Sequence, residues 1–281
     1  MDKQVRTVKR IVTGKRTTDG AGVKLVRVFG HKDTADFDPF LMLDAFDSTN
    51  PDDYVRGFPW HPHRGIETIT YLIQGSIEHG DSLGNKGRIG DGDCQWMTAG
   101  SGIVHQEMPQ SSERMLGVQL WLNLPAKDKM TAPKYHGILQ SDIPVVEEGD
   151  SKVHVIAGTY RGFDGAMAGD YVKPLYLDVE LAPETHWQLE TAPGLNLFVY
   201  ILQGAGRFSS EDSAPIEEKQ AVLFNEGTVF KVKAADAGMR FLLLAGLMLK
   251  EPVAWGGPIV MNTKEELDLA FQELENNTFV K

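Results

Sequence analysis

The chain has 281 residues, of which 42% are hydrophobic and 24% charged, as in an ordinary globular protein. Its net charge of −11 argues against direct binding to a nucleic-acid backbone. At about 150 residues per domain, this length suits two domains. No apolar run is long enough for a membrane span, so we expect neither a span nor a signal peptide. The single cysteine, Cys94, excludes an internal disulfide, and we expect a cytoplasmic protein.

The first 27 residues are basic, in contrast to the chain as a whole. One interpretation is an arm that binds an acidic partner. The interpretation we prefer is an exposed edge strand, whose charges prevent pairing with other chains. The basic residues are Lys3, Arg6, Lys9, Arg10, Lys15, Arg16, Lys24 and Arg27.

Short segments with the apolar pattern of β-strands dominate the chain, and glycine, proline, asparagine and aspartate lie between them. Many short strands separated by turn residues indicate an all-β sandwich or small barrel. The segments are 23–29, 67–73, 117–124, 152–158, 175–181, 197–204, 221–225, 229–234 and 240–247.

One segment near the C-terminus has the pattern of a helix. Thr263 followed by Glu266 forms a capping box, the usual start of a helix. Apolar residues then recur on one face at helical spacing: Leu267, Ala270, Phe271 and Leu274. We expect this helix to cover a sheet or the seam between two domains.

The sequence contains a weak internal repeat, which suggests a tandem duplication. ETITYLIQG at 67–75 resembles NLFVYILQG at 196–204, and the join is expected within 124–138. Aligning the two halves on this repeat places four second-half residues opposite the polar residues His61, His63, His105 and Glu107. These counterparts are Glu190, Ala192, Phe230 and Val232, so any polar site of the first half is lost in the second.

Two histidines lie one residue apart in the stretch WHPHRGIE. Side chains at i and i+2 of a strand point to the same face, so His61 and His63 point together if this stretch is extended. Pro62 favours an extended backbone but cannot donate a ladder hydrogen bond, which predicts a strand start or an edge strand. Gly65 and Glu67 would share the histidine face, with Gly65 leaving space there.

A second pair with the same spacing, His105 and Glu107, follows in GIVHQE. Three imidazoles and a carboxylate that meet inside a barrel suit a divalent first-row metal. A single histidine is more often structural than a ligand, and the inference depends on the two pairs together. The isolated histidines are interpreted as non-ligands: His31, His79, His136, His154 and His186.

These motifs carry a family resemblance. GxxxHxHxxxE followed by GxxHxE is similar to the two cupin motifs, and the chain as a whole resembles the pirin family of bicupins. The matching segments span almost the whole chain: DPFLMLDAF (38–46), HPHRGIETITYLIQG (61–75), DCQWMTAGSGIVHQE (93–107), LGVQLWLNLP (116–125) and GPIVMNTKEEL (257–267).

The resemblance implies two tandem cupin (jelly-roll-like) antiparallel β-barrels with a C-terminal helix. Residues 1–134 would form the cupin domain with the metal site, and 135–281 a cupin domain without ligands. The implied ligands of one metal ion are His61, His63, His105 and Glu107. Iron(II) is the expected metal, although Zn²⁺, Cu²⁺, Mn²⁺, Ni²⁺ or Co²⁺ suits the same ligands. Glu67 would then orient a ligand histidine.

The resemblance also implies quercetin 2,3-dioxygenase activity, with a flavonol and dioxygen as substrates. Glu107 is the candidate base for the flavonol 3-hydroxyl proton. Four apolar residues near the motifs are candidates for lining a pocket or for barrel core: Phe58, Trp60, Met97 and Trp121.

Two other functions stay open. Eukaryotic members of the family imply a metal-dependent regulatory module that binds a protein partner without catalysis. Another cupin reaction, isomerisation or lyase chemistry, would need no oxygen. We expect a monomer in either case.

Overall fold

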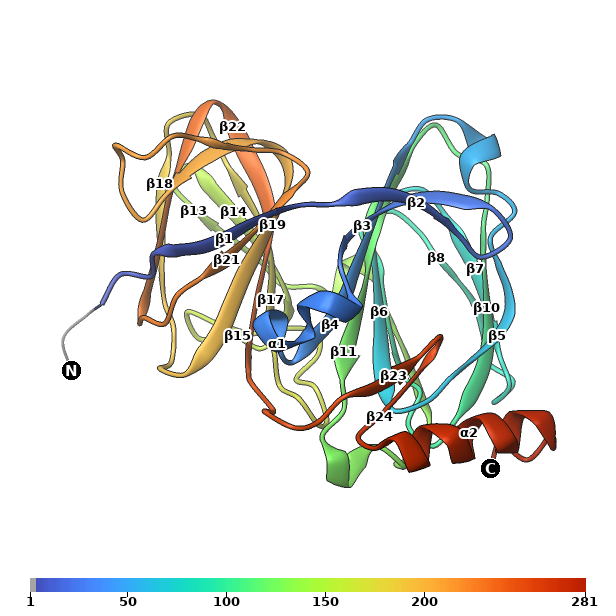
Figure 1. Ribbon diagram of the computed structural model, residues 1–281. Coiled ribbons are helices and arrows are strands. Elements are labelled where there is room, and N and C mark those ends of the chain that lie inside the picture. Colours follow the sequence, from blue (N-terminus) through green and yellow to red (C-terminus); the bar gives the residue numbers. More distant parts are fainter. Residues whose placement is uncertain (1–3) are drawn as a thin grey trace. The chain divides into compact units, whose positions relative to one another are not determined.

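The computed structural model describes residues 4–281, and Lys3 lies outside this range. The chain is mostly β-strand, as predicted (Figure 1), and it forms two compact units. We call residues 15–140 and 249–281 the histidine unit, because it contains the predicted ligands. We call residues 4–14 and 141–248 the aromatic unit, after the rings in its core. Within residues 4–281, no helix has the length and apolar character needed to cross a bilayer.

The histidine unit is built from two antiparallel sheets. The seven-stranded sheet has the order β12-β9-β6-β11-β4-β3-β2, the four-stranded sheet has the order β5-β10-β7-β8, and β23 pairs with β24. The strands are β2 (Lys15–Asp19), β3 (Val23–Phe29), β4 (Phe40–Ser48), β5 (Phe58–His63), β6 (Ile66–Gln74), β7 (Ile77–Asp81), β8 (Lys86–Ile89), β9 (Cys94–Thr98), β10 (Ile103–Pro109), β11 (Met115–Asn123), β12 (Lys134–Ile138), β23 (Ala254–Gly256) and β24 (Ile259–Met261). The helices are α1 (Thr34–Phe37) and α2 (Lys264–Glu275).

The aromatic unit has a nine-stranded sheet of order β1-β21-β19-β22-β17-β14-β13, in which β18 also pairs with β22 and β20 with β19. A separate pair is formed by β15 and β16. The strands are β1 (Val8–Thr13), β13 (Val145–Glu148), β14 (Ser151–Ala157), β15 (Thr159–Tyr160), β16 (Phe163–Asp164), β17 (Leu175–Leu181), β18 (His186–Glu190), β19 (Leu195–Phe208), β20 (Ile216–Glu217), β21 (Gln220–Phe224) and β22 (Val229–Leu247). The two strands expected at 229–234 and 240–247 are thus one long strand.

The two units do not follow the expected division into 1–134 and 135–281. The first strand, β1, pairs with β21 and belongs to the aromatic unit. Residues 249–281 return to the histidine unit, where α2 packs against β24 (Figure 1). The N-terminal strand therefore completes the unit formed mainly by the second half of the chain, and the C-terminal segment completes the unit formed mainly by the first half. In each case the strand partners or apolar contacts of the terminal segment lie in that unit.

The C-terminal helix begins as predicted. The Thr263 hydroxyl accepts from the backbone N–H of Glu266, and the Glu266 carboxylate accepts from the Thr263 N–H. Ala270 is buried with Ile259, Met261 and Phe279, and two further predicted apolar residues, Leu267 and Leu274, pack on this cluster. The helix covers part of the histidine unit, in agreement with its expected role on a sheet.

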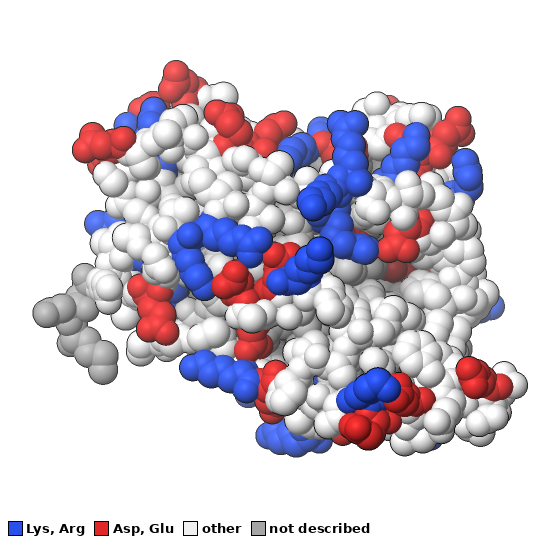
Figure 2. Space-filling view, in the orientation of Figure 1, with Lys and Arg blue, Asp and Glu red and all other residues white. Residues whose placement is uncertain are grey.

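The basic N-terminal segment forms edge strands in part, as we preferred, but Lys24 and Arg27 lie on β3, which is not at an edge of its sheet. β1 lies at one end of the nine-stranded sheet and β2 at one end of the seven-stranded sheet. Arg6 is an exception, because it is buried and donates to Thr191 and to the carbonyl of Leu195. On the face shown in Figure 2, basic and acidic side chains are interspersed. The segment thus provides one buried arginine and two charged edge strands.

The core of the aromatic unit has apolar side chains where the histidine unit has its histidines. Phe230 packs against Trp187, Phe224 and Phe241, with ring centroids 5.9, 5.1 and 6.2 Å away. The register pairs Leu189 with Phe230.

The matching pair in the histidine unit is His61 with His105. Because Phe230 corresponds to His105, Leu189 is the counterpart of His61, and the expected counterpart Glu190 is off by one residue. Glu190 is exposed, whereas Leu189 is buried. The alignment on the repeat differs from the observed register here because it assumed the same spacing between the strands in both halves.

Candidate metal centre

His61 and His63 lie on β5, which is the edge strand of the four-stranded sheet. Their rings are 4.8 Å apart between centroids, as expected for side chains on one face of a strand. Pro62 lies between them and pairs in register with Val104 on β10. The edge position suits proline, since only one side of the strand needs ladder donors. The predicted geometry of this pair is confirmed.

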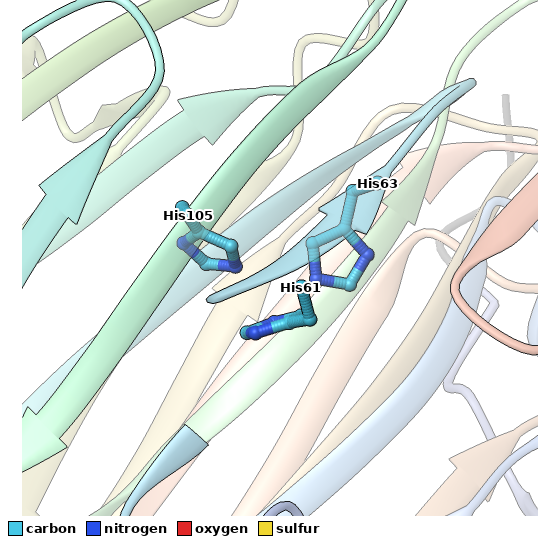
Figure 3. Close-up of side chains that lie close together, drawn as sticks. All are labelled: His61, His63 and His105. Carbon is cyan, nitrogen blue, oxygen red and sulfur yellow. The ribbon is translucent and has the colours of Figure 1, made fainter. Parts of the chain in front are cut away.

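His105 on β10 completes a cluster of three imidazoles. Its ring centroid is 4.4 Å from that of His61 and 5.0 Å from that of His63. One potential ligand atom from each ring lies within 4.8 Å of the other two. Figure 3 shows that one nitrogen of His105 points toward the other two rings and the other points away. The two strands thus bring together three of the four predicted ligands.

Hydrogen bonds set the tautomers of two of these histidines. Nδ1 of His61 is 2.8 Å from the carbonyl oxygen of Pro59, and Nδ1 of His63 is 3.1 Å from that of Pro258. A carbonyl only accepts, so Nδ1 carries the proton in both rings and Nε2 keeps its lone pair. Among residues 4–281, neither nitrogen of His105 has a hydrogen-bond partner.

The cluster fits a divalent metal ion. Burial, reinforced by the neighbouring His61, lowers the pKa of His63 to about 3. Burial and the three nearby histidines lower the pKa of His105 well below its usual value. Both rings are therefore neutral at pH 7, which is the form that binds metal. A buried imidazole with an unpartnered nitrogen aimed at two others costs stability unless that nitrogen has a ligand to bind.

Glu107 is not part of the cluster of mutually close ligand atoms. The pairing of β10 with β5 shifts register between His105 and Glu107, because β5 has one extra residue there, whereas β10 pairs continuously with β7. The buried carboxylate of Glu107 accepts hydrogen bonds from Thr70 at 2.9 Å, from Gln119 at 2.6 Å and from Gln95 at 3.5 Å. The role of Glu107 as fourth ligand stays a prediction.

The other two residues of the histidine motif have different surroundings from those expected. Gly65 has a positive φ, and a Cβ there would collide with the carbonyl oxygen of Val260. The space beside Gly65 is thus occupied by the C-terminal segment and is not room beside a metal. Glu67 is buried and accepts from the Thr98 hydroxyl at 2.7 Å. Its expected action on a ligand histidine stays a prediction.

A cavity of about 650 Å³ opens beside His61 and His63. Trp121 and Trp255 form an aromatic wall, with ring centroids 5.6 Å apart. The cavity is lined by Asp19, Gly20, Arg27, His31, Met42, Asp44, Phe58, Pro59, His61, His63, Gln119, Trp121, Trp255, Gly257 and Pro258. Of the four apolar candidates, Phe58 and Trp121 thus line this cavity, whereas Met97 is buried core and Trp60 is exposed.

The cavity wall also carries a charged pair. Arg27 donates two hydrogen bonds to the carboxylate of Asp44, at 2.9 and 2.8 Å, and a third to Asp19 at 2.7 Å. Burial raises the pKa of Asp44, and the Arg27 guanidinium opposes that shift. This pair gives an otherwise largely aromatic cavity a polar side.

Sequence reasoning missed the C-terminal contribution to this centre. Trp255 and Pro258 lie about two hundred residues from His61, yet they line the cavity, and the Pro258 carbonyl holds His63. Buried Lys129 links the same segment to the histidine strand, because its Nζ donates to Gly65, Asn123 and Val260. The only signal in the sequence was the GPIV motif, to which no role had been given.

Comparison with known proteins identifies the family. The Pirin family model matches residues 22–122, and the model of the Pirin C-terminal cupin domain matches residues 176–280. A pirin-like protein of Caulobacter vibrioides is 43% identical over 278 residues, which cover 98% of this chain and 99% of that protein. The chain belongs to the pirin family.

Two further relatives show the extent of the match to pirins. A pirin-like protein of Solanum lycopersicum is 39% identical over 271 residues, covering 96% of this chain and 91% of that one. The crystal structure of quercetin 2,3-dioxygenase from Acinetobacter baumannii superimposes with a TM-score of 0.89 at 33% identity and covers 98% of both chains. The all-β bicupin arrangement with a C-terminal helix, expected from the sequence, is confirmed.

Proposed function

We propose that this pirin binds one divalent metal ion, Fe²⁺ in the first instance, and opens the ring of flavonols such as quercetin with dioxygen. The observation that carries the proposal is the cluster of three imidazoles, His61, His63 and His105, beside a cavity with an aromatic wall. The likeness to a solved protein named quercetin 2,3-dioxygenase, at 33% identity over 98% of the chain, supports the choice of reaction.

The cavity suits a flat, polyhydroxylated substrate. Trp121 and Trp255 offer ring faces on which an aromatic bicycle can stack. Arg27 and Asp44 offer a donor and an acceptor for ring hydroxyls. Phe58 and Met42 add apolar surface to the same space, which would favour displacement of water by an aromatic substrate. These side chains would hold the flavonol with its 3-hydroxyl toward His61 and His63.

Bound iron(II) would supply Lewis acidity and an electron route to dioxygen. In the overall reaction both oxygen atoms of dioxygen enter the products, and one ring carbon leaves as carbon monoxide.

We assign Glu107 two roles, as fourth ligand and as acceptor of the flavonol 3-hydroxyl proton. The Gln119 side chain lines the cavity and also donates to Glu107, so it lies between the substrate space and this carboxylate. Proton transfer to a Glu107 oxygen requires this hydrogen bond to be exchanged for one from the substrate.

Oxygen consumption with quercetin tests the proposal. The iron-loaded parent should consume oxygen and release carbon monoxide, and His61→Ala should lose both activities. His186→Ala is the matched control, because that histidine is exposed on β18 and should leave turnover unchanged. Glu107→Gln keeps the size of the side chain and should lose turnover while the three histidines still bind metal. Turnover by His61→Ala equal to that of the parent would rule the proposal out.

A metal-dependent protein-binding module is the second candidate. The indole of Trp60 is 54% exposed and lies next to His61 on β5, so a metal at His61 would stiffen the strand that presents it. This function predicts metal-dependent capture of a partner that Trp60→Ala abolishes, together with slow turnover that does not discriminate among flavonols. Rapid turnover of one flavonol that is unaffected by Trp60→Ala contradicts it.

A further inference from the structure

A second buried polar group lies beside the histidine cluster, on the opposite side of β10 from β5. Asp81 on β7 pairs in register with His105, and His79 pairs with Glu107. Residues paired in this way point to the same face of the sheet, so His79 and Asp81 face the barrel interior with the ligands. The ring centroids of His79 and His105 are 5.6 Å apart.

Local contacts determine which nitrogen of His79 carries its proton. The Asp81 carboxylate accepts from the backbone N–H groups of Leu83 and Asn85, at 2.9 and 3.0 Å, and from the Asn85 amide at 2.9 Å. Held in this way, it also lies 3.3 Å from Nε2 of His79. A carboxylate held by donors accepts, so Nε2 of His79 is protonated and Nδ1 is left with a lone pair.

Within residues 4–281, His79 has a buried hydrogen-bond acceptor without a partner, and His105 has a donor without one. Nδ1 of His79 is a buried acceptor without a partner among the described residues. When one nitrogen of His105 faces the metal, the other carries a proton, and this nitrogen points away from the cluster (Figure 3). His61 and His63 each satisfy this requirement with a backbone carbonyl, whereas His105 has no such partner in the described chain.

We propose that His79 and Asp81 are positioning residues for His105. In this arrangement one buried water accepts the N–H of His105 and donates to Nδ1 of His79, which Asp81 holds in the required tautomer. A water is the group that can bridge two polar atoms too far apart to bond directly. The inference rests on the proposed metal binding, and it assigns a role to a histidine that the sequence pattern classed as a non-ligand.

Metal binding by variants of His79 provides the test, with Co²⁺ as the probe. His79→Phe keeps a ring against Tyr135, on which His79 stacks at 4.6 Å, but removes the lone pair. We expect roughly a ten- to a hundredfold weaker Co²⁺ affinity and a shifted visible spectrum of the bound ion. His79→Asn places an amide oxygen near the position of Nδ1 and should restore much of the affinity. Tyr135→Phe is the control and should match the parent.

Nitrogen-15 NMR of the metal-free protein tests the same inference without metal. We expect the Nε2–H tautomer for His79 and a single tautomer for His105, which His79→Phe should turn into a mixture. Parent affinity and spectrum in His79→Phe, an Nδ1–H tautomer for His79, or equal weakening by His79→Phe and Tyr135→Phe would each overturn the proposal. A parent protein that binds no Co²⁺ would refute the proposed function. The NMR tautomers of His79 and His105 would still test this inference in that case.

Discussion

The two units share a strand pattern but fill corresponding positions with opposite chemistry. In the histidine unit, the register pair at the centre is His61 and His105, with the polar side chains of Glu107 and Gln119 close by. In the aromatic unit, the pair is Leu189 and Phe230. Both the polar pair and the apolar pair fit the two-residue period of strands. This period specifies which side chains point inward, but it does not specify their chemistry.

The difference shows what a polar interior requires. Each buried polar group of the histidine unit needs a partner, and several are supplied from far away in the chain, such as the Pro258 carbonyl for His63. The aromatic core needs only shape and apolar area. We therefore expect the aromatic unit to contribute stability and the histidine unit to contribute the chemistry. The following predictions test this contrast in order of their expected effect on the free energy of unfolding.

Phe230→Ala should have the largest effect. Removing a fully buried ring from the aromatic core should lower the free energy of unfolding by about 3–5 kcal/mol. Denaturant titration measures the loss, and Phe230→Leu should lose less because it leaves a smaller cavity. The metal content per chain should be the same in both variants as in the parent. A metal content that falls in proportion to the stability would contradict the separation of the two roles.

Lowering the pH from 7 to 5 should destabilise the metal-free protein through the histidine unit. Burial lowers the pKa of His63 to about 3, while the unfolded chain binds this proton near pH 6.5. The stability is therefore complete above pH 6.5 and is lost as the pH falls through this window, by about 2 kcal/mol at pH 5 for this one residue.

Urea denaturation with a chelator present, at both pH values, gives this loss. His63→Gln has no such proton to bind and should show a smaller difference between pH 7 and pH 5. An equal difference in His63→Gln and the parent would show that the pH dependence comes from elsewhere, the aromatic unit included.

Thr263→Ala should have the smallest effect on the free energy of unfolding. This variant tests whether the C-terminal helix supports the metal centre of the histidine unit. Losing the capping hydroxyl should lower the free energy of unfolding by about 1 kcal/mol. Because α2 follows the segment that holds His63, the affinity for Co²⁺ should also fall. Thr263→Ser keeps the hydroxyl and should behave as the parent. Equal losses in the alanine and serine variants would show that the cap is not the cause.

Much of this protein was predictable because its signals are local. Strand alternation placed His61 and His63 on one face, and the capping box located the start of α2 at Thr263. The HxH pair and the HxE pair together contain the three histidines that meet at the cluster. The expectation that the second half carries no such site stays a prediction.

The remaining features depend on pairings over long sequence separations, which a local pattern does not encode. The return of residues 249–281 to the histidine unit puts Trp255 and Pro258 at the cavity and fills the space beside Gly65.

Thr70, Gln95 and Gln119 hold the Glu107 carboxylate from other strands, and the pairing of β10 with β7 brings His79 beside His105. By itself, the sequence determined which side chains face the interior of each barrel. Only the tertiary structure decided which of them touch, because strand register and the docking of a distant segment are settled by packing and hydrogen bonding across the whole fold.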